Sequence, residues 1–535
     1  MMMNTKALTI AAMLAVGSAA CDASYTDDAA AGTGAGGAGI DEDDWGGSGG
    51  PDDGDGVGPA VGQGGAQDFG QFRAILDAGD IPGPETIDSV GFFAEHRIDL
   101  GAAECGEDVC LNGALAVMGN LMTGSNCTMV MMGMTTPIDL AEEPRLPLNL
   151  AIAIDTSGSM RGTPIEYVRS GLSQMREALH PEDTITLIGF ADDAVILADA
   201  VAADDDALED AIASLNADGS TNVYAGLRAA LEHVEARADG EHQNRVILLS
   251  DGEATTGIVN DARVQSLAES YAHEGIALST IGMGESFNPT LMRRLSEVGG
   301  GAFYFVEDPA AVEEVFVEEV EAFLLPLAQD VVIDAEIAEG YTLRGVFGTQ
   351  QFVLTPERTR IEIPALQLAH RESASDNEGG RRGGGGAIVL ELMPDDGASG
   401  QDVGTLRIAY DTPRDEARIE QEVTIASSLQ PGDTPADGFF GTDGSRKAFV
   451  TLNLYVGFEM AATRAAAGDG ASALNVLRPL RDAVALWLES FPDPDIEDDL
   501  RYVDRFIENL EARGVEPPMQ GGGEVPPPPE PWPQD

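Results

Sequence analysis

The sequence is poor in positive charge, in aromatic side chains and in cysteine. Its 535 residues include 30 basic and 92 acidic residues, a formal net charge of −62, and Lys6 and Lys447 are the only lysines. A polyanion would be repelled, so the composition argues against nucleic acid as a partner. Aromatic residues make up 6% of the chain and apolar residues 43%, so aliphatic side chains must fill the cores of several domains.

Cysteine and histidine are too scarce and too scattered for a zinc site or a nucleophilic centre. Of four cysteines, Cys105 and Cys110 are close enough to bridge a small loop, which leaves Cys127 free or paired between chains. No histidine lies beside a cysteine cluster, and the six histidines form no motif with a nucleophile. The chain also has no phosphate-binding loop, and we therefore predict that it is not an enzyme.

No stretch reaches membrane-spanning length, and the first 20 residues are typical of a signal peptide. Lys6 precedes an apolar core over residues 7–16, and small residues 17–20 form a cleavage site before Cys21. Ten apolar residues are too few to span a bilayer. We expect cleavage before Cys21 and lipidation of its thiol, giving a lipoprotein anchored in the cell envelope. The alternative is a secreted or periplasmic soluble protein.

Changes in composition and in hydrophobic period divide the rest of the chain. The first segment is dominated by glycine, aspartate and alanine and is expected to be a disordered acidic tether. Alternating strand and helix patterns then indicate an α/β domain. Period-two runs after it indicate an antiparallel β-sandwich-like domain, and helical patterns follow. The expected ranges are 1–20 signal peptide, 21–67 tether, 68–145 an N-terminal α/β region with the cysteines, 146–325 the α/β domain, 327–428 the sandwich-like domain, 436–514 a small helical module and 515–535 a disordered proline-rich tail.

One stretch combines a buried strand with a row of oxygen donors. Residues 148–154 are a nearly continuous apolar run, as expected for a strand buried on both faces of a parallel sheet. Asp155, Ser157 and Ser159 follow at alternate positions, at the carboxyl end of the strand, where ligands of such sheets bind. Hard divalent cations prefer such oxygen ligands.

Two later stretches supply further oxygens. Thr221 lies in a loop before a helical pattern, and Asp251 ends a second apolar strand, residues 246–249. Together, Asp155-x-Ser157-x-Ser159, Thr221 and Asp251 resemble the metal-ion-dependent adhesion site of the von Willebrand factor type A (VWA) domain. The resemblance covers residues 146–325, and the short region before them is similar to that of one family of bacterial VWA surface proteins.

The resemblance implies a doubly wound, mostly parallel sheet and a bound Mg²⁺, with Mn²⁺ or Ca²⁺ as alternatives. In the family the serine and threonine hydroxyls bind the metal directly, and the aspartates usually act through water. The cation then keeps one open position, which an Asp or Glu carboxylate of a partner protein can fill. We expect an adhesion or scaffold protein. The alternatives are a structural subunit of an envelope complex whose metal only stabilises the fold, and, with less support, a hydrolase or an ion-conductance component.

Overall fold

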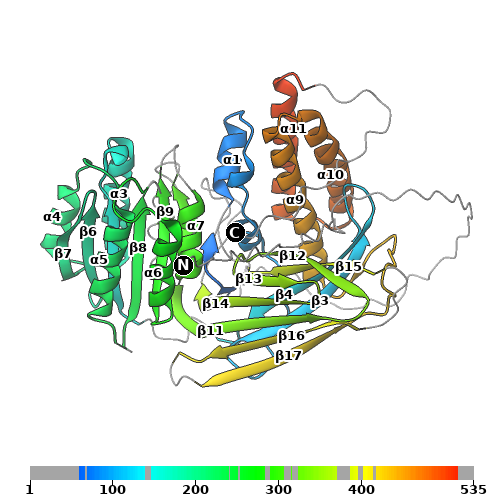
Figure 1. Ribbon diagram of the computed structural model, residues 1–535, viewed down its shortest axis with the longest axis horizontal. Helices are drawn as coiled ribbons and strands as arrows, with labels where there is room; N and C mark the ends of the chain where they lie inside the picture. The colour runs from blue at the N-terminus through cyan, green and yellow to red at the C-terminus, as the bar shows by residue number, and fades with distance from the viewer. Residues whose placement is uncertain are drawn as a thin grey trace, which may run out of the picture.

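The molecule combines an α/β domain, a β-sandwich and a bundle of helices (Figure 1). A computed structural model of the chain describes a set of ranges, to which all structural statements here refer: 60–66, 69–138, 146–239, 241–250, 254–283, 289–306, 315, 323–369, 386–395, 402–413 and 417–515. Cys21, Asp251 and the proline-rich tail lie outside these residues. No described helix combines the length and the apolar character needed to cross a bilayer.

The α/β domain is built on a seven-stranded sheet whose strands are parallel except for one edge strand, as predicted. β5 (Leu148–Asp155) is buried along its whole length between β8 (Gln243–Ser250) and β6 (Thr184–Phe190). The continuous apolar run therefore has the expected cause, which is burial of both faces. The remaining strands are β9 (Ile276–Met283), β10 (Gly300–Val306) and β2 (Gly65–Ala66) beyond β8, and antiparallel β7 (Ala194–Ala202) beyond β6.

Helices cover both faces of this sheet, and β5 has different side chains toward each. Its larger residues, such as Ile152, join the core beneath two helices, and its alanines, such as Ala153, join the core beneath the other three. The first pair is α3 (Thr163–Ala178) and α4 (Asp206–Ser214); the others are α5 (Val223–Glu235), α6 (Asp261–Ala272) and α7 (Pro289–Val298). Asn222 caps α5, which fixes the loop before that helix.

The sandwich is assembled from strands on both sides of the α/β domain in sequence. In its five-stranded sheet, β4 lies between β3, its hairpin partner, and β15, which comes after the α/β domain. The α/β domain is therefore an insertion between strands of one sandwich. That sheet comprises β12 (Tyr341–Phe347), β15 (Ile388–Pro394), β4 (Asn126–Thr135), β3 (Cys110–Gly119) and β18 (Phe439–Phe440).

The facing sheet of the sandwich has six strands in the described chain. They are β1 (Ala60–Gly62), β14 (Arg358–Ala369), β11 (Phe323–Ile337), β16 (Asp402–Asp411), β17 (Arg418–Ala426) and β13 (Phe352–Thr355), which pairs with β14. β11 begins at Phe323, so the strand starts inside the range that was expected for the α/β domain.

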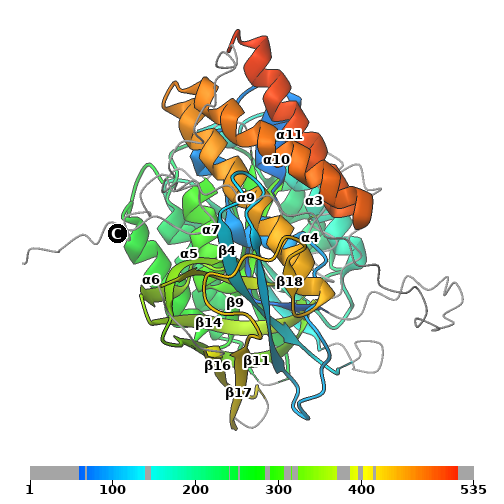
Figure 2. The same ribbon diagram turned by 90° about the vertical axis from the view of Figure 1, so that its right-hand side faces the viewer.

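The helical bundle combines the beginning and the end of the described chain. α9 (Asp443–Ala466), α10 (Gly470–Ser490) and α11 (Pro494–Ala512) pack with α1 (Gly70–Asp77), η1 (Pro84–Thr86) and α2 (Ser89–Ala94) around one core. α9 crosses the outer face of β3 and β4 (Figure 2). The 68–145 region, which the sequence analysis treated separately, is thus shared between the bundle and the sandwich.

The methionines of β4 lie on both faces of its sheet. Met129 and Met131 of β4 pack into the bundle core, while Met132 and Met134 pack into the sandwich core, so the methionine-rich run is buried packing.

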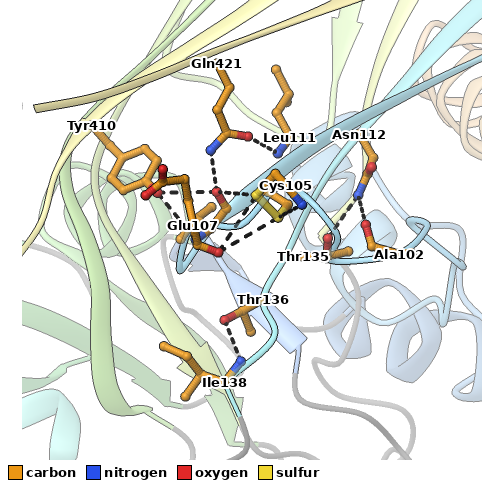
Figure 3. Close-up of a disulfide and its surroundings, with 12 residues drawn as sticks. Ala102, Cys105, Glu107, Leu111, Asn112, Thr135, Thr136, Ile138, Tyr410 and Gln421 are labelled. Carbon is orange, nitrogen blue, oxygen red and sulfur yellow. Dashed lines mark hydrogen bonds between the residues drawn. A yellow bond between two sulfur atoms is a disulfide. The ribbon is translucent and has the colours of Figure 1, made fainter.

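The Cys105–Cys110 disulfide is present, as predicted (Figure 3). It closes a loop that docks on the sandwich: Val109 exchanges hydrogen bonds with the Tyr410 hydroxyl, and its carbonyl accepts one from Gln421 at 2.6 Å. The expectation of a free or interchain Cys127 thiol is corrected, because Cys127 is disulfide-bonded and no described cysteine is free.

Candidate metal centre

Asp155 ends β5 and its carboxylate is held at both oxygens. The residue is fully buried. Oδ1 accepts the backbone N–H of Ser157 at 2.8 Å, and Oδ2 accepts the hydroxyl of Ser250 at 2.6 Å. Ser250 is well placed to do this because β5 and β8 are parallel and paired residue for residue up to Ile154 and Leu249. A carboxylate has lone pairs for further partners, so the carboxylate is oriented but can still accept more hydrogen bonds.

Ser157 and Ser159 lie in the turn that follows, where the chain enters the short helix η2 (Gly158–Met160). Their hydroxyl oxygens are hydrogen-bonded to each other at 2.9 Å. Two adjacent ligands of an octahedral Mg²⁺, each at 2.0–2.1 Å from the ion, would be separated by about 2.9 Å. Ser157 is buried and Ser159 is exposed, so the pair reaches from the protein interior to the surface.

The Thr221 loop is fastened to this turn by backbone hydrogen bonds. The N–H of Gly158 donates to the carbonyl of Gly219 at 3.0 Å, and the N–H of Asp218 donates to the carbonyl of Thr156 at 2.7 Å. Gly219 has φ +97°, a conformation that L side chains rarely adopt. Thr221 is buried, with 3% of its surface exposed. The structure therefore brings the Thr221 loop against the Asp155–Ser159 turn.

A third loop, after β8, joins the same assembly. Thr221 donates its N–H to the Thr255 hydroxyl at 2.8 Å, and its carbonyl accepts the N–H groups of Thr255 and Thr256 at 2.9 and 3.1 Å. Asp251 belongs to this connection but lies outside the described residues, so its place in the site stays a prediction. Ser250, directly before it, reaches Asp155 as described above.

A fourth loop, between β6 and β7, flanks the site. The side-chain amide of Asn222 donates to the carbonyl of Asp192 at 3.0 Å, and its backbone N–H donates to the carbonyl of Ala191 at 2.8 Å. Ser220 donates its hydroxyl and its N–H to the Asp192 carboxylate, which holds the pKa of Asp192 below its usual value. An exposed Arg161–Asp218 ion pair at 3.0 Å lies at the outer edge.

Sequence reasoning missed two supporting residues, Ser250 and Thr255. Ser250 was detectable, because a serine at the last position of an otherwise apolar buried strand needs a hydrogen-bond partner. Thr255 gave no comparable signal, because a threonine in a polar loop after Asp251 is an ordinary loop residue.

The donor set suits a hard divalent cation. Asp155, Ser157, Ser159 and Thr221 offer only oxygen, and the two serine oxygens have the spacing of adjacent ligands. Among the described residues there is no group of three or more His, Cys, Asp or Glu that could hold a metal. When bound, such an ion would supply a positive charge able to attract a carboxylate.

A cleft of about 490 Å³ opens at the opposite end of the sheet, between the α/β domain and the sandwich. It is lined by residues at the amino ends of β8 and β9, including Gln243 and Ala277. Ligands of parallel α/β sheets bind at the carboxyl ends instead. The His242 ring beside it pairs with Asp239 at 2.7 Å. We therefore take the carboxyl ends of the strands, where Asp155 lies, and not this cleft, as the candidate functional site.

The fold and the site define a doubly wound α/β domain with its ligand edge at the carboxyl ends of the strands. Residues 149–318 match the family model of the von Willebrand factor type A domain. This part of the chain is a VWA domain, in agreement with the resemblance of its sequence.

Two curated relatives match about a third of this chain. YfbK, an uncharacterized protein of Escherichia coli K12, is 31% identical over 191 residues, which is 35% of this chain and 33% of YfbK. Inter-alpha-trypsin inhibitor heavy chain H4 of Sus scrofa is 30% identical over 194 residues, 34% of this chain and 21% of that protein. The match thus spans a third or less of these relatives. A solved von Willebrand factor type A structure from Catenulispora acidiphila has a TM-score of 0.47, with 18% identity, and covers 72% of this chain and 88% of that one.

Proposed function

We propose that the VWA domain binds a partner protein through a divalent cation, most simply Mg²⁺, held by Asp155, Ser157, Ser159, Thr221 and Asp251. The observation that supports it most is the 2.9 Å spacing of the Ser157 and Ser159 hydroxyls beside a buried, oriented Asp155 carboxylate. VWA domains mediate protein–protein interactions, and this general role is common to the family.

The partner's contribution follows from the charges. Hydroxyl ligands carry no charge, so an ion held directly by Ser157, Ser159 and Thr221 keeps most of its positive charge. An Asp or Glu side chain of a partner completes the coordination with a full negative charge. Binding then requires both the metal and a carboxylate on the partner.

Capture of partners from envelope extracts tests the proposal. The wild-type chain should retain the partner in Mg²⁺ and release it on chelation, and Asp155→Ala should fail to retain it. Asp193→Ala removes an exposed carboxylate from the neighbouring β6–β7 loop and is the matched control. Capture that survives both chelation and Asp155→Ala would instead favour a structural subunit whose metal only stabilises the fold.

The proposed role is non-enzymatic, as is typical of VWA proteins that act in adhesion or as scaffolds. The Asp155 site presents no histidine in its described hydrogen-bonded loops to serve as a general base. Hydrolytic turnover by the pure protein that disappears in Asp251→Ala would overturn this part of the proposal.

We also propose that the protein is exported and anchored in the cell envelope through Cys21. The Cys105–Cys110 disulfide supports export, because such bonds persist in oxidising compartments. A lipid thioether on Cys21 uses the sulfur that a disulfide of the same residue would need, so these two states exclude each other. Mass spectrometry of the N-terminal peptide distinguishes them. Cys21→Ser should move an anchored protein from the membrane fraction to the soluble fraction; unchanged partition would contradict the anchor.

A further inference from the structure

Apolar side chains gather at the rim of the metal centre. Six large apolar side chains are well exposed in the described chain: Val195, Ile196, Val259, Val353, Leu486 and Phe491. The first two begin β7, just after the β6–β7 loop, and the third lies on the loop that follows β8. We call Val195, Ile196 and Val259 the apolar rim; their exposed fractions are 58%, 37% and 54%.

Both segments of the apolar rim adjoin the Thr221 loop through one residue, Asn222. Its side-chain amide holds the carbonyl of Asp192, three residues before Val195. Gly257, two residues before Val259, packs closely against the Asn222 side chain. A Cβ atom added to Gly257 would lie only 2.2 Å from the side-chain oxygen of Asn222. The two segments that carry the apolar rim therefore both contact Asn222, the residue next to Thr221.

β7 adds backbone groups to this surface. In the described sheet it is the edge strand and pairs only with β6. Its nine residues include a single charge, Asp199, which is paired with Arg237 at 2.8 Å. Edge strands are usually protected by charges, because their free N–H and C=O groups can pair with another extended chain. The pairing of β7 with β6 is regular at Ala194–Ile196 and shifts in register beyond them, and Ala200 has φ +48°. The regular and apolar start of β7 is therefore the part of the edge that is suited to accept an extended chain.

The charge of the surroundings limits the occupant. Asp192, Asp193 and Asp218 lie on the loops that flank the site, and the whole chain carries −62. A second copy or a strongly acidic partner would be repelled. The apolar rim also lacks the polar groups that would bind the hydroxyls of a polysaccharide. A partner segment that directs one carboxylate at the cation and carries apolar residues beside it fits this surface.

We propose that the partner of the VWA domain binds as an extended protein segment, with one Asp or Glu at the cation and apolar side chains on Val195, Ile196 and Val259. The segment lies along the free edge of β7. This inference rests on the proposed metal-dependent binding and names its partner class. The apolar rim supplies selectivity for the residues beside the carboxylate, and the cation supplies selectivity for the carboxylate itself.

A displayed peptide library tests the proposal on the full chain. Each peptide has nine residues, the length of β7, with a fixed central aspartate and randomised flanks, and selection is run in Mg²⁺. The wild-type chain should enrich apolar, β-branched or aromatic flanks. The triple variant Val195→Thr, Ile196→Thr, Val259→Thr should lose this preference and bind an enriched peptide about tenfold more weakly, or worse.

The control is Val353→Thr, an equally exposed valine on β13 of the sandwich, which should select like the wild type. Charged or polar flanks, equal selection by the triple variant, or no enrichment over empty support would overturn the proposal. Selection that depends on Mg²⁺ but shows no flank preference would leave the metal-dependent function standing and would refute the apolar rim. Selection of apolar flanks that is unchanged by chelation would leave the apolar rim standing and would refute the metal-dependent function.

Discussion

Asp155 shows how a single side chain is prepared for its role. Burial of a carboxylate costs free energy unless hydrogen bonds compensate for the lost water. Here one oxygen is matched by the Ser157 N–H and the other by the Ser250 hydroxyl. The sequence singled out Asp155, Ser157, Ser159 and Thr221 as candidates, because oxygen donors at strand ends form a recognisable pattern. It did not identify the residues that orient them, because a hydrogen bond between neighbouring strands depends on register.

The first prediction concerns that orientation. Ser250→Ala removes the hydroxyl bound to Asp155 Oδ2 and should weaken Mn²⁺ binding about 10- to 100-fold, as loss of an orienting partner does at metal sites. The free energy of unfolding should fall by about 2 kcal/mol, because a buried carboxylate loses one of its hydrogen bonds. Isothermal titration with Mn²⁺ and urea unfolding measure the two effects. Ser266→Ala, on the exposed face of α6, is the control; an unchanged affinity in Ser250→Ala would refute the orienting role.

At the scale of elements, α7 joins the VWA domain to the rest of the molecule. Glu297 accepts the backbone N–H of Gln350 at 2.6 Å, and the Gln350 side chain donates to Asp88 at 3.2 Å. Arg293 lies 3.6 Å from the same Asp88 carboxylate. Burial, with a smaller contribution from Asp88, raises the pKa of Glu297 from 4.5 to about 7. This junction therefore contains a carboxyl group that the fold prefers to keep neutral.

The second prediction is a pH dependence at this junction. Because the folded state raises the pKa of Glu297, it binds the proton more tightly than the unfolded state does. The stabilising effect of that proton is complete below pH 4.5 and is lost as the pH rises to about 7, in total about 3 kcal/mol. Glu297→Gln should remove this part of the dependence. Urea unfolding of both proteins across this range gives the difference, and parallel curves would contradict the assignment.

The third prediction concerns the disulfide loop. Cys105 and Cys110 close a short loop, and loop-closure entropy gives such a bridge about 2 kcal/mol of stabilisation. The double variant Cys105→Ser, Cys110→Ser should therefore lower the free energy of unfolding by that amount without changing Mn²⁺ affinity, because the loop docks on the sandwich. Loss of metal binding in this variant would show a connection between the two regions that the contacts do not show.

On the scale of the whole molecule, the chain leaves the sandwich, forms the VWA domain and returns. The alternation of strands and helices predicted the VWA domain, since each βα unit folds against its sequence neighbours. It could not predict that β4 pairs with β15, for example Met132 with Ile388. A buried apolar strand shows only that it needs neighbours. Which strands they are is decided by packing between segments far apart in sequence.

The fourth prediction follows from this insertion. Relative to a chain that begins at residue 60, one that begins at residue 146 lacks the strands β1 to β4 and the helices α1, η1 and α2. The sandwich sheet would be interrupted between β15 and β18, and the bundle core would be exposed. The shorter chain should lose cooperative unfolding and bind a hydrophobic dye. If it melts at the same temperature as the longer chain, the shared core does not matter to stability.

The most direct measurement is the titration of the full chain with Mn²⁺, by calorimetry and by electron paramagnetic resonance. We predict one tight ion per chain in the wild type and in Asp193→Ala, and loss of that ion in Asp155→Ala and in Ser157→Ala. A wild-type chain without a tight ion, or an Asp155→Ala chain that binds it with equal affinity, would contradict the account.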